Sequence, residues 1–447
     1  MSTPSVGLKP DSAWHNNFAA LNAANGPFAD LRRQAWSEFS AKGFPDPREE
    51  EWRWTNVSPI AGLDFTDADQ SAVAAVSAES VLALAPSLAE GPRLTLVDGL
   101  FHAAASNLAD LPEGLKLHPL AAVLAEDPTS VSELLGQQAE GRLNRFVSMN
   151  TALMRDGVVI EVADNAQIST PVTILHAFGL TGPQRSCQPR VLIRLGAHAE
   201  LTLIEQHVSM AKQQSLNNEV LEITLGENAK LNHVILGEAA DDSFMIIAAW
   251  AALARDAHYR SLNYQFGGKL TRLDLNISED DTGAHSELIG LLMPRGHQHI
   301  DTHTRIHHNS AHTTSNEHYR AIADEHGRAV FKGRILVAQD AQKIEAYQSS
   351  ANLILSDNAE IDAKPELEIY ADDVKCSHGA TIGQLDKEAL YYLQSRGISK
   401  SQARELLIFG FAEEVINHLD HPELRAHLTR RVAGNLASTL LEDFLKP

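Results

Sequence analysis

The sequence contains very little cysteine: among its 447 residues, only Cys187 and Cys376 carry thiols. Proteins that depend on disulfide bonds are much richer in cysteine, so this chain is not a disulfide scaffold, and its composition fits a reducing compartment. A conventional iron-sulfur cluster is held by four thiolates. The chain therefore cannot hold an all-cysteine cluster by itself, and any cluster or metal bound to it must take ligands from elsewhere.

Basic residues and long apolar runs are also scarce. The chain has 37 Lys and Arg against 58 Asp and Glu, and its net charge of -21 repels phosphate backbones and anionic lipid headgroups. Nucleic-acid and membrane-surface functions are therefore disfavoured. The first residues lack the basic region and apolar run of a signal peptide, and no uninterrupted apolar stretch of about 18 residues follows. These absences predict a cytoplasmic protein.

Sequence signatures of catalysis are missing as well. Gly267, Gly268 and Lys269 are followed by Leu270 and lack the spacing of a phosphate-binding loop. We find no nucleophile elbow and no recognisable catalytic triad signature. The sequence therefore predicts a protein that is not an enzyme on its own and that leaves ATP to another subunit.

Residues 150–385 show short β-strand patterns at nearly regular intervals, for example at 158–162, 191–195, 221–225 and 367–369. Three of the intervening turns resemble one another, and their small residues Ala166, Ala199 and Ala229 are 33 and 30 positions apart. Such repeats are typical of stacked coils, so we predict a parallel β-helix. A left-handed β-helix would need a strict six-residue period, which is absent. A β-sandwich stays open, although the turns lack the usual hairpin pairs.

Helical patterns flank this core. Residues 1–135 are predicted to form a mostly helical domain, with apolar residues spaced by three or four at Phe28, Leu31, Ala35 and Phe39. Within it, the segment REEEWRWT at 48–55 places two tryptophans two apart, which we interpret as a hydrophobic anchor on an extended segment. A short strand pair is expected around Asp98-Gly99.

Residues 386–447 are predicted to form a C-terminal helical domain. Asp386 is a plausible N-cap, and Ser399 with Gln402 makes a capping-box pattern. The last helix has apolar residues four apart, from Leu424 to Leu440. These helices are expected either to dock a partner or to cap the open end of the β-helix.

Seven of the 21 histidines lie between residues 297 and 318. If this segment is a strand, Ile300 and Ile306 share one face, whereas His299, His303 and His307 share the other. The β-branched face fits the interior. We therefore predict that these histidines form a solvated or partner-facing ladder, in preference to a metal site.

A second group of candidate residues is the pair Cys376 and His378, which would face the same side of a strand. Thiolate and imidazole are good ligands for iron or zinc, yet two ligands leave a tetrahedral site half empty. The shortfall favours a site shared with another chain. The alternative is a buried cysteine beside a hydrogen-bonded histidine.

The stretch KPELEIYADDVKCSHGATIGQLDKEALYYLQSRG at 364–397 closely resembles the C-terminal signature of the SufB and SufD family of the SUF iron-sulfur cluster assembly system. The similarity continues upstream through GRAVFKG at 327–333 and downstream into the helical tail. The segment REEEWRWT, the moderate length and the shortage of thiols are more similar to the SufD branch than to the SufB branch.

The resemblance implies a right-handed parallel β-helix between two helical domains and a non-catalytic scaffold for de novo cluster assembly. It implies pairing with SufB through the β-helix and binding of the ATPase SufC through residues 386–447, while a homodimer in isolation stays open. His378 matches a histidine that the family places near the SufB interface, and Cys376 is its neighbour. Both are candidate ligands for iron or a nascent cluster shared with SufB, with none held by this chain alone.

Two other classes of function are compatible with a β-helix. A carbohydrate-active β-helix enzyme would carry clustered carboxylates in a groove, and a histidine-rich metal-binding oxidase would bind iron or copper through residues 297–318. Saccharide turnover and metal analysis, respectively, would reveal them.

Overall fold

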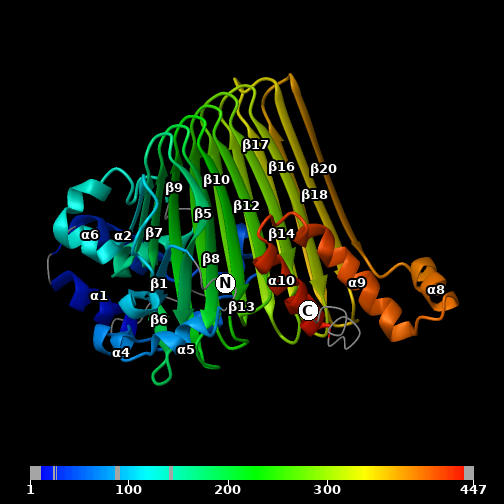
Figure 1. Cartoon of the computed structure of the whole chain (residues 1–447), viewed down its shortest axis with the longest axis horizontal. Helices are drawn as coiled ribbons and strands as arrows, with labels where there is room; N and C mark the ends of the chain where they lie inside the picture. Colours follow the sequence, from blue (N-terminus) through cyan, green and yellow to red (C-terminus); the bar gives the residue numbers. More distant parts are fainter. Residues whose placement is uncertain (1–11, 24–25, 27, 86–90, 140–143, 437–447) are drawn as a thin grey trace.

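The computed structural model describes residues 12–436 except 24–25, 27, 86–90 and 140–143. Its centre is a parallel β-solenoid of about eight turns between residues 157 and 383, with helices at both ends of the sequence (Figure 1). The predicted parallel β-helix with flanking helical regions is thereby confirmed. Two facing sheets enclose its interior, here called the lumen.

The first sheet has the strand order β2-β1-β5-β8-β10-β12-β14-β16-β18-β20. Apart from the antiparallel pair β1 and β2, neighbouring strands run parallel. The strands are β1 (Arg93–Val97), β2 (Leu100–Phe101), β5 (Gln167–Phe178), β8 (Glu200–Ser209), β10 (Lys230–Glu238), β12 (His258–Gln265), β14 (His285–Leu292), β16 (Thr314–Ala323), β18 (Ile344–Ile354) and β20 (Val374–Gly383).

The second sheet has the order β19-β17-β15-β13-β11-β9-β7-β4-β3, and β6 pairs with β9 beside this path. Within the described residues of this sheet, only β3 and β4 pair in antiparallel fashion. The strands are β3 (Leu115–Pro119), β4 (Gly157–Val162), β6 (Arg185–Cys187), β7 (Arg190–Leu195), β9 (Ser215–Leu225), β11 (Phe244–Leu253), β13 (Leu270–Glu279), β15 (His299–His308), β17 (Arg328–Val337) and β19 (Glu360–Ile369).

The repeated turns form the tight bends that their small residues predict. Asn165, His198 and Asn228 have φ of 64°, 59° and 56°, a left-handed conformation that asparagine tolerates well. Each is followed by an alanine, of which Ala199 and Ala229 are buried. The left-handed residue turns the chain sharply, and the small side chain after it fits inside the bend. This arrangement lets the turns stack at intervals of about 30 residues.

Most of the N-terminal helices cover the outer face of the second sheet, whereas α4 (Gln70–Ala74) and α5 (Ala78–Leu82) pack against β5 and β8 of the first sheet. Trp36, Phe39 and Trp52 pack there with Phe244 and Ile246 of β11. Trp52 lies in a short 3-10 helix, which corrects the predicted extended segment while confirming its anchoring role. The helices are α1 (Ala13–Ala23), α2 (Ala29–Lys42), η1 (Glu50–Trp52), α3 (Ser58–Ala61), α4 (Gln70–Ala74), α5 (Ala78–Leu82), η3 (Ala103–Ala105), α6 (Leu120–Glu126), η4 (Pro128–Val131) and α7 (Arg145–Leu153).

The C-terminal helices are α8 (Lys387–Ser395), α9 (Lys400–Ile416) and α10 (Pro422–Asn435). Asp386 caps α8, and Ser399 with Gln402 forms the predicted capping box of α9. Leu440 of the predicted last helix lies outside the described residues. None of the helices that the structure describes is long and apolar enough to cross a membrane.

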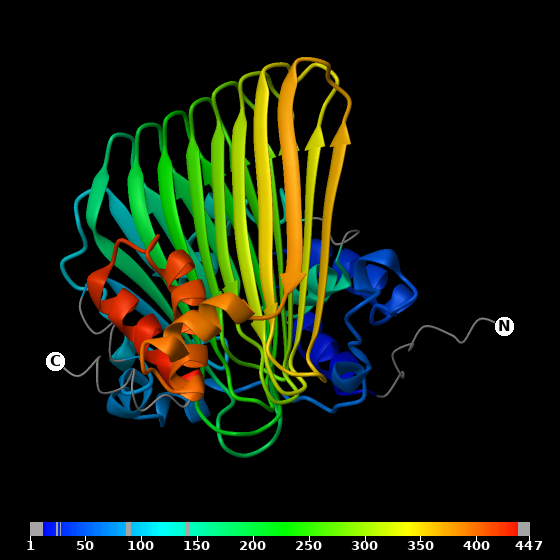
Figure 2. The same cartoon turned by 90° about the vertical axis from the view of Figure 1, so that its right-hand side faces the viewer.

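Helices α9 and α10 pack against the outer face of the first sheet, on the opposite side of the solenoid from α1, α2 and α7 (Figure 2). Ile408 and Leu428 are fully buried there against residues such as Leu262 and Ile289. The expectation that these helices cap the open end of the solenoid is therefore wrong, because they cover a side of it. Only α8, which has no buried residue, projects away from the body (Figure 1).

Candidate functional site

Cys376 and His378 lie on β20, the last strand of the first sheet. In the parallel register, Cys376 is paired with Ala346 and His378 with Gln348. Ala346 and Gln348 are buried and face the lumen. The two candidate ligands therefore continue inward-facing rows into the last turn, and they share one face as the sequence predicts.

The environments of the two side chains differ. The Cys376 thiol is partly buried against Ile344 and Ala346, and this burial raises its pKa. His378 is exposed, and its imidazole makes no hydrogen bond or ion pair within the described part of the chain. The site thus combines a protonated thiol with an imidazole that has no hydrogen bond or ion pair in the described residues. Both need further ligands from elsewhere to hold a metal.

A buried polar row leads from the lumen to His378. Glu317 of β16 is paired with Gln348 of β18, which is in turn paired with His378. Gln348 donates a hydrogen bond to Glu317. Burial raises the pKa of Glu317 to about 7, despite hydrogen bonds from Thr304 and Gln348. A carboxyl group able to exchange a proton near neutral pH therefore lies two strands behind the exposed imidazole.

Sequence reasoning missed this row, although a signal for it exists. Glu317, Gln348 and His378 are 31 and 30 positions apart, which is the spacing of successive turns. Extending the turn period to polar residues would have placed the three side chains in one row.

The last turn is uncovered by the described residues. β19 and β20 end the two sheets, so each has one edge without a neighbouring strand. Large apolar side chains are exposed nearby, including Ile369, Tyr370 and Ile382, of which Tyr370 is 61% exposed. Unpaired strand edges with apolar neighbours readily pair with another chain. The open end of the solenoid is therefore a surface suited to a partner.

The histidine-rich strand β15 has the predicted alternation but a different environment. Ile300 and Ile306 are fully buried and face inward. On the outer face His303 is only 1% exposed, because the N-terminal segment around Glu51 and Thr55 lies over it. The predicted outward direction of these histidines is confirmed, but the prediction of a solvated or partner-facing surface is wrong for His303, whereas His299 and His307 are partly exposed.

An ion network replaces the predicted surface ladder. The Glu51 carboxylate contacts Arg305, is 2.9 Å from Lys332 Nζ and is 3.5 Å from His303 Nδ1. Burial alone would raise the pKa of Glu51, but the His303 hydrogen bond and the charges of Arg305 and Lys332 lower it overall. Arg272 stacks 3.9 Å from the ring centre of Trp52. These contacts fix the REEEWRWT segment to the solenoid.

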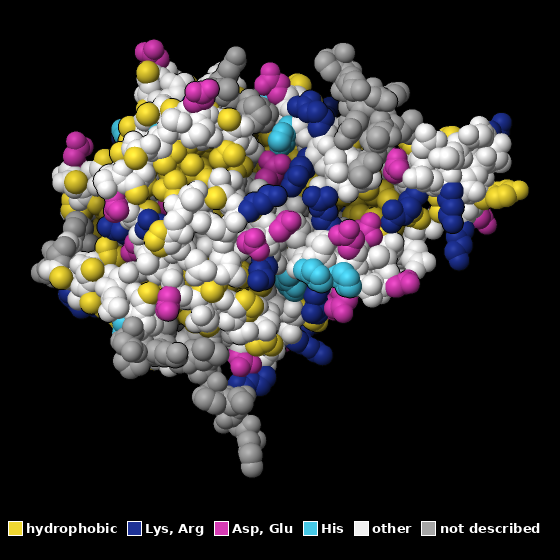
Figure 3. Space-filling view, turned by 90° about the horizontal axis from the view of Figure 1, so that it is seen from below, with side chains coloured by type: hydrophobic (Ala, Val, Ile, Leu, Met, Phe, Trp, Pro, Cys, Tyr) yellow, Lys and Arg dark blue, Asp and Glu magenta, His cyan; other side chains and the backbone are white. Residues whose placement is uncertain are grey.

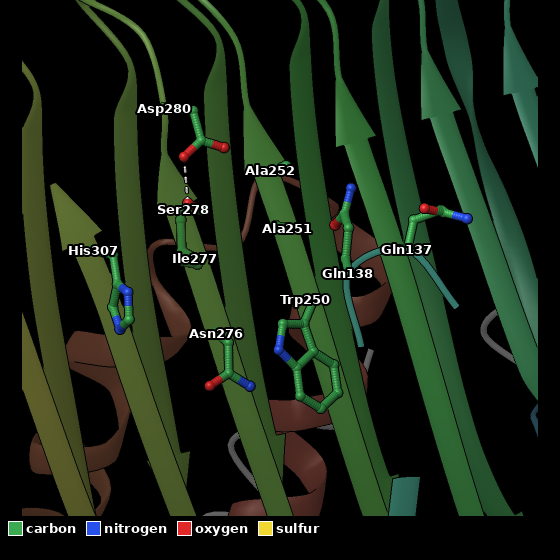
Figure 4. Close-up of a pocket in the computed structure, with 10 residues that line it drawn as sticks. All are labelled: Gln137, Gln138, Trp250, Ala251, Ala252, Asn276, Ile277, Ser278, Asp280 and His307. Carbon is green, nitrogen blue, oxygen red and sulfur yellow. Dashed lines mark hydrogen bonds between the residues drawn. The ribbon is translucent and has the colours of Figure 1, made fainter. Parts of the chain in front are cut away.

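Two further features lie elsewhere in the fold. Inside the first turns, His176, His207 and Glu219 form a buried group that could hold a metal ion. On the outer face of β11 and β13, Trp250 and Asp280 help to line a pocket with a single histidine, His307 (Figure 4). The pocket contains no thiol, so it does not resemble the pair on β20.

The fold defines a parallel β-solenoid with few thiols. At its open end, one chain offers only two candidate metal ligands among the described residues, Cys376 and His378. The SufBD core domain of SUF system iron-sulfur cluster assembly matches residues 178–411, and the SufBD N-terminal region matches residues 15–174. The chain belongs to the SufBD family.

Several relatives are similar over nearly their whole length. An iron-sulfur cluster assembly SufBD family protein of Synechocystis is 34% identical, with 87% of each chain covered. The iron-sulfur cluster assembly protein SufD of Escherichia coli is 30% identical over 95% of this chain and 96% of its own length. The chloroplastic protein ABCI7 of Arabidopsis thaliana is 27% identical over 94% and 89%, respectively.

Proposed function

We propose that this chain is a SufD-type scaffold subunit that does not complete a reaction alone. In this proposal Cys376 and His378 supply ligands to iron or a nascent iron-sulfur cluster at an interface with SufB. The observation that carries the proposal is the position of this pair, inward-facing in the last turn, where the edges of both sheets are uncovered. Two ligands are too few for a closed site, so the partner must provide the others.

The chemistry of the row supports such a role. A thiol with a raised pKa must lose its proton before it can bind iron, and a bound cation favours that loss. Glu317, with a pKa of about 7, is suited to accept or return a proton near neutral pH. In the strand register, Gln348 lies between Glu317 and His378.

The proposed partner surfaces are separate in the fold. SufB would extend the sheets at β19 and β20, where Ile369 and Ile382 are exposed. SufC would bind α8, whose Tyr391 and Tyr392 are 75% and 57% exposed. Figure 3 shows an apolar projection at the tip of the molecule that carries α8, beside basic side chains. Exposed tyrosines are favourable anchors in protein interfaces.

Pairwise co-expression of the tagged chain with SufB or with SufC tests this assignment. Ile382→Asp should reduce SufB retention and leave SufC retention unchanged. The double variant Tyr391→Asp with Tyr392→Asp should do the reverse. Full retention of both partners by both variants would contradict the proposal. Truncation after Gly383 is a poorer test, because loss of α9 would expose the outer face of the first sheet.

A further inference from the structure

The first turns of the solenoid contain a buried group of ligating side chains far along the chain from His378. His176 on β5, His207 on β8 and Glu219 on β9 are 3%, 0% and 0% exposed. His176 and His207 are register partners on adjacent strands of the first sheet. Glu219 reaches them from the second sheet, across the lumen.

The three side chains converge on one point. Glu219 Oε1 is 3.1 Å from His176 Nε2, and Glu219 Oε2 is 2.6 Å from His207 Nε2. The imidazole rings are stacked with centroids 4.5 Å apart and planes 7° from parallel. One ligand atom from each residue lies within 4.8 Å of the others. Both imidazoles thus direct a nitrogen at the same carboxylate.

Hydrogen bonding leaves this group incomplete. His176 Nε2 and Glu219 Oε1 form an ion pair at 3.1 Å without hydrogen-bond geometry, and the buried His207 Nδ1 has no hydrogen-bond partner. Buried polar atoms nearly always have well-aligned hydrogen-bond partners, so the poorly aligned contact between His176 and Glu219 and the unpaired His207 Nδ1 require an explanation. A cation between the imidazoles and the carboxylate would satisfy Nε2 of His176 and Oε1 of Glu219 together.

Charge supports a cation in this place. Burial alone would raise the pKa of Glu219, but the adjacent His176 and His207 lower it, so the carboxylate is ionised. An ionised carboxylate inside the lumen favours a bound cation.

The neighbouring thiol is not part of the group. Cys187 Sγ donates to Asn217 Oδ1 at 3.1 Å, and burial raises the pKa of this thiol well above its usual value. The neighbouring His233 is occupied at both ring nitrogens, because it contacts Glu205 Oε2 and the Tyr259 hydroxyl. The available ligands are therefore two imidazoles and one carboxylate, a set that suits zinc and divalent iron.

We propose that His176, His207 and Glu219 form a lumenal binding site for a divalent transition-metal ion that links the two sheets of the solenoid. The site is independent of the proposed ligands at the open end. Because the histidines bind in the neutral form, metal binding releases protons and strengthens as pH rises. Because the bound ion would be held by both sheets, it would also raise the unfolding temperature.

Cobalt(II) is the probe, since its visible spectrum reports its ligands. The full chain is freed of metal with a chelator and then loaded with Co²⁺, either by titration or by refolding in its presence. One equivalent should bind and raise the unfolding temperature. His207→Gln and Glu219→Gln should each lower the bound metal at least tenfold. His118→Ala, which removes an exposed histidine from the first turns, and His378→Ala should both retain one equivalent.

X-ray absorption of the cobalt-loaded wild-type chain provides a test that does not depend on variant folding. Nitrogen and oxygen ligands that include two imidazoles, with no sulfur, support the site. Sulfur ligation, no bound cobalt by either loading route, or full binding by natively folded Glu219→Gln would overturn it.

Discussion

Glu51 Oε1 lies 2.9 Å from Lys332 Nζ, although 281 positions separate the two residues in the chain. Arg305 contacts the same carboxylate. Lys332 and Arg305 are only 3% and 9% exposed at their side chains, so their charges depend on buried partners for compensation. The N-terminal segment is therefore an integral part of the middle turns of the solenoid.

Glu51→Gln should destabilise the protein by about 3 kcal/mol, because it removes the nearest counter-charge of the two buried cations Lys332 and Arg305. Chemical denaturation at neutral pH measures the loss. Glu50→Gln is the matched control, since Glu50 is adjacent but exposed and pairs with the partly exposed Lys364, and it should change stability little. Equal effects of the two substitutions would contradict the role of Glu51.

The same substitution has a pH signature. The pKa of Glu51 is lowered in the folded protein from 4.5, so its contribution is fully present above pH 4.5 and is lost as pH falls below it. The stability difference between wild type and Glu51→Gln should therefore shrink in acid. A difference that stays constant from pH 7 to pH 3 would show that packing, and not charge, is responsible.

Glu317→Gln should stabilise the protein in alkaline solution. The pKa of Glu317 rises from 4.5 to about 7 on folding, so the folded state binds the extra proton and wild-type stability falls between these pH values. At pH 8 the variant should gain on the order of 3 kcal/mol, because glutamine keeps an acceptor for Gln348 without the buried charge. At pH 4 the two proteins should unfold at similar temperatures. A gain that does not vary with pH would contradict the raised pKa.

Joint replacement of His299, His303 and His307 by glutamine should leave the iron content of the SUF complex unchanged. It should nevertheless lower stability by about 1–3 kcal/mol, because His303 lies 3.1 Å from Asp301 and His299 is 2.8 Å from Thr55. Metal analysis and thermal unfolding of the same preparation separate the two effects. Loss of iron from a complex with normal subunit ratios would show that these histidines are ligands.

The alternation of inward and outward side chains along β15 was predictable from the sequence. The segment that covers its outer face was not. Strand periodicity correctly places Ile300 and Ile306 inside the solenoid. It cannot reveal that Glu51, more than 250 positions from Arg305, lies over the outer face. A contact of that separation depends on how the N-terminal region packs, which local pattern does not encode.

The group of His176, His207 and Glu219 in the lumen was also only partly predictable from the sequence. His176 and His207 are 31 positions apart, as one turn of the solenoid requires, so their proximity follows from the repeat. Glu219 comes from the opposite sheet, only 12 positions after His207. Its approach depends on the distance between the sheets. Cys376 and His378, by contrast, need only strand parity to share a face.

The central claim is that His378 supplies a ligand at the open end of the solenoid. His378→Ala and its control His118→Ala both remove an exposed strand histidine, at opposite ends of the fold. Each variant complex with SufB and SufC is purified, checked for subunit ratio and unfolding temperature, and supplied with iron and sulfide. We expect His378→Ala to form a normal complex and to lose at least tenfold in cluster assembly, whereas His118→Ala assembles clusters as wild type does. Normal cluster assembly by an intact His378→Ala complex would contradict the claim.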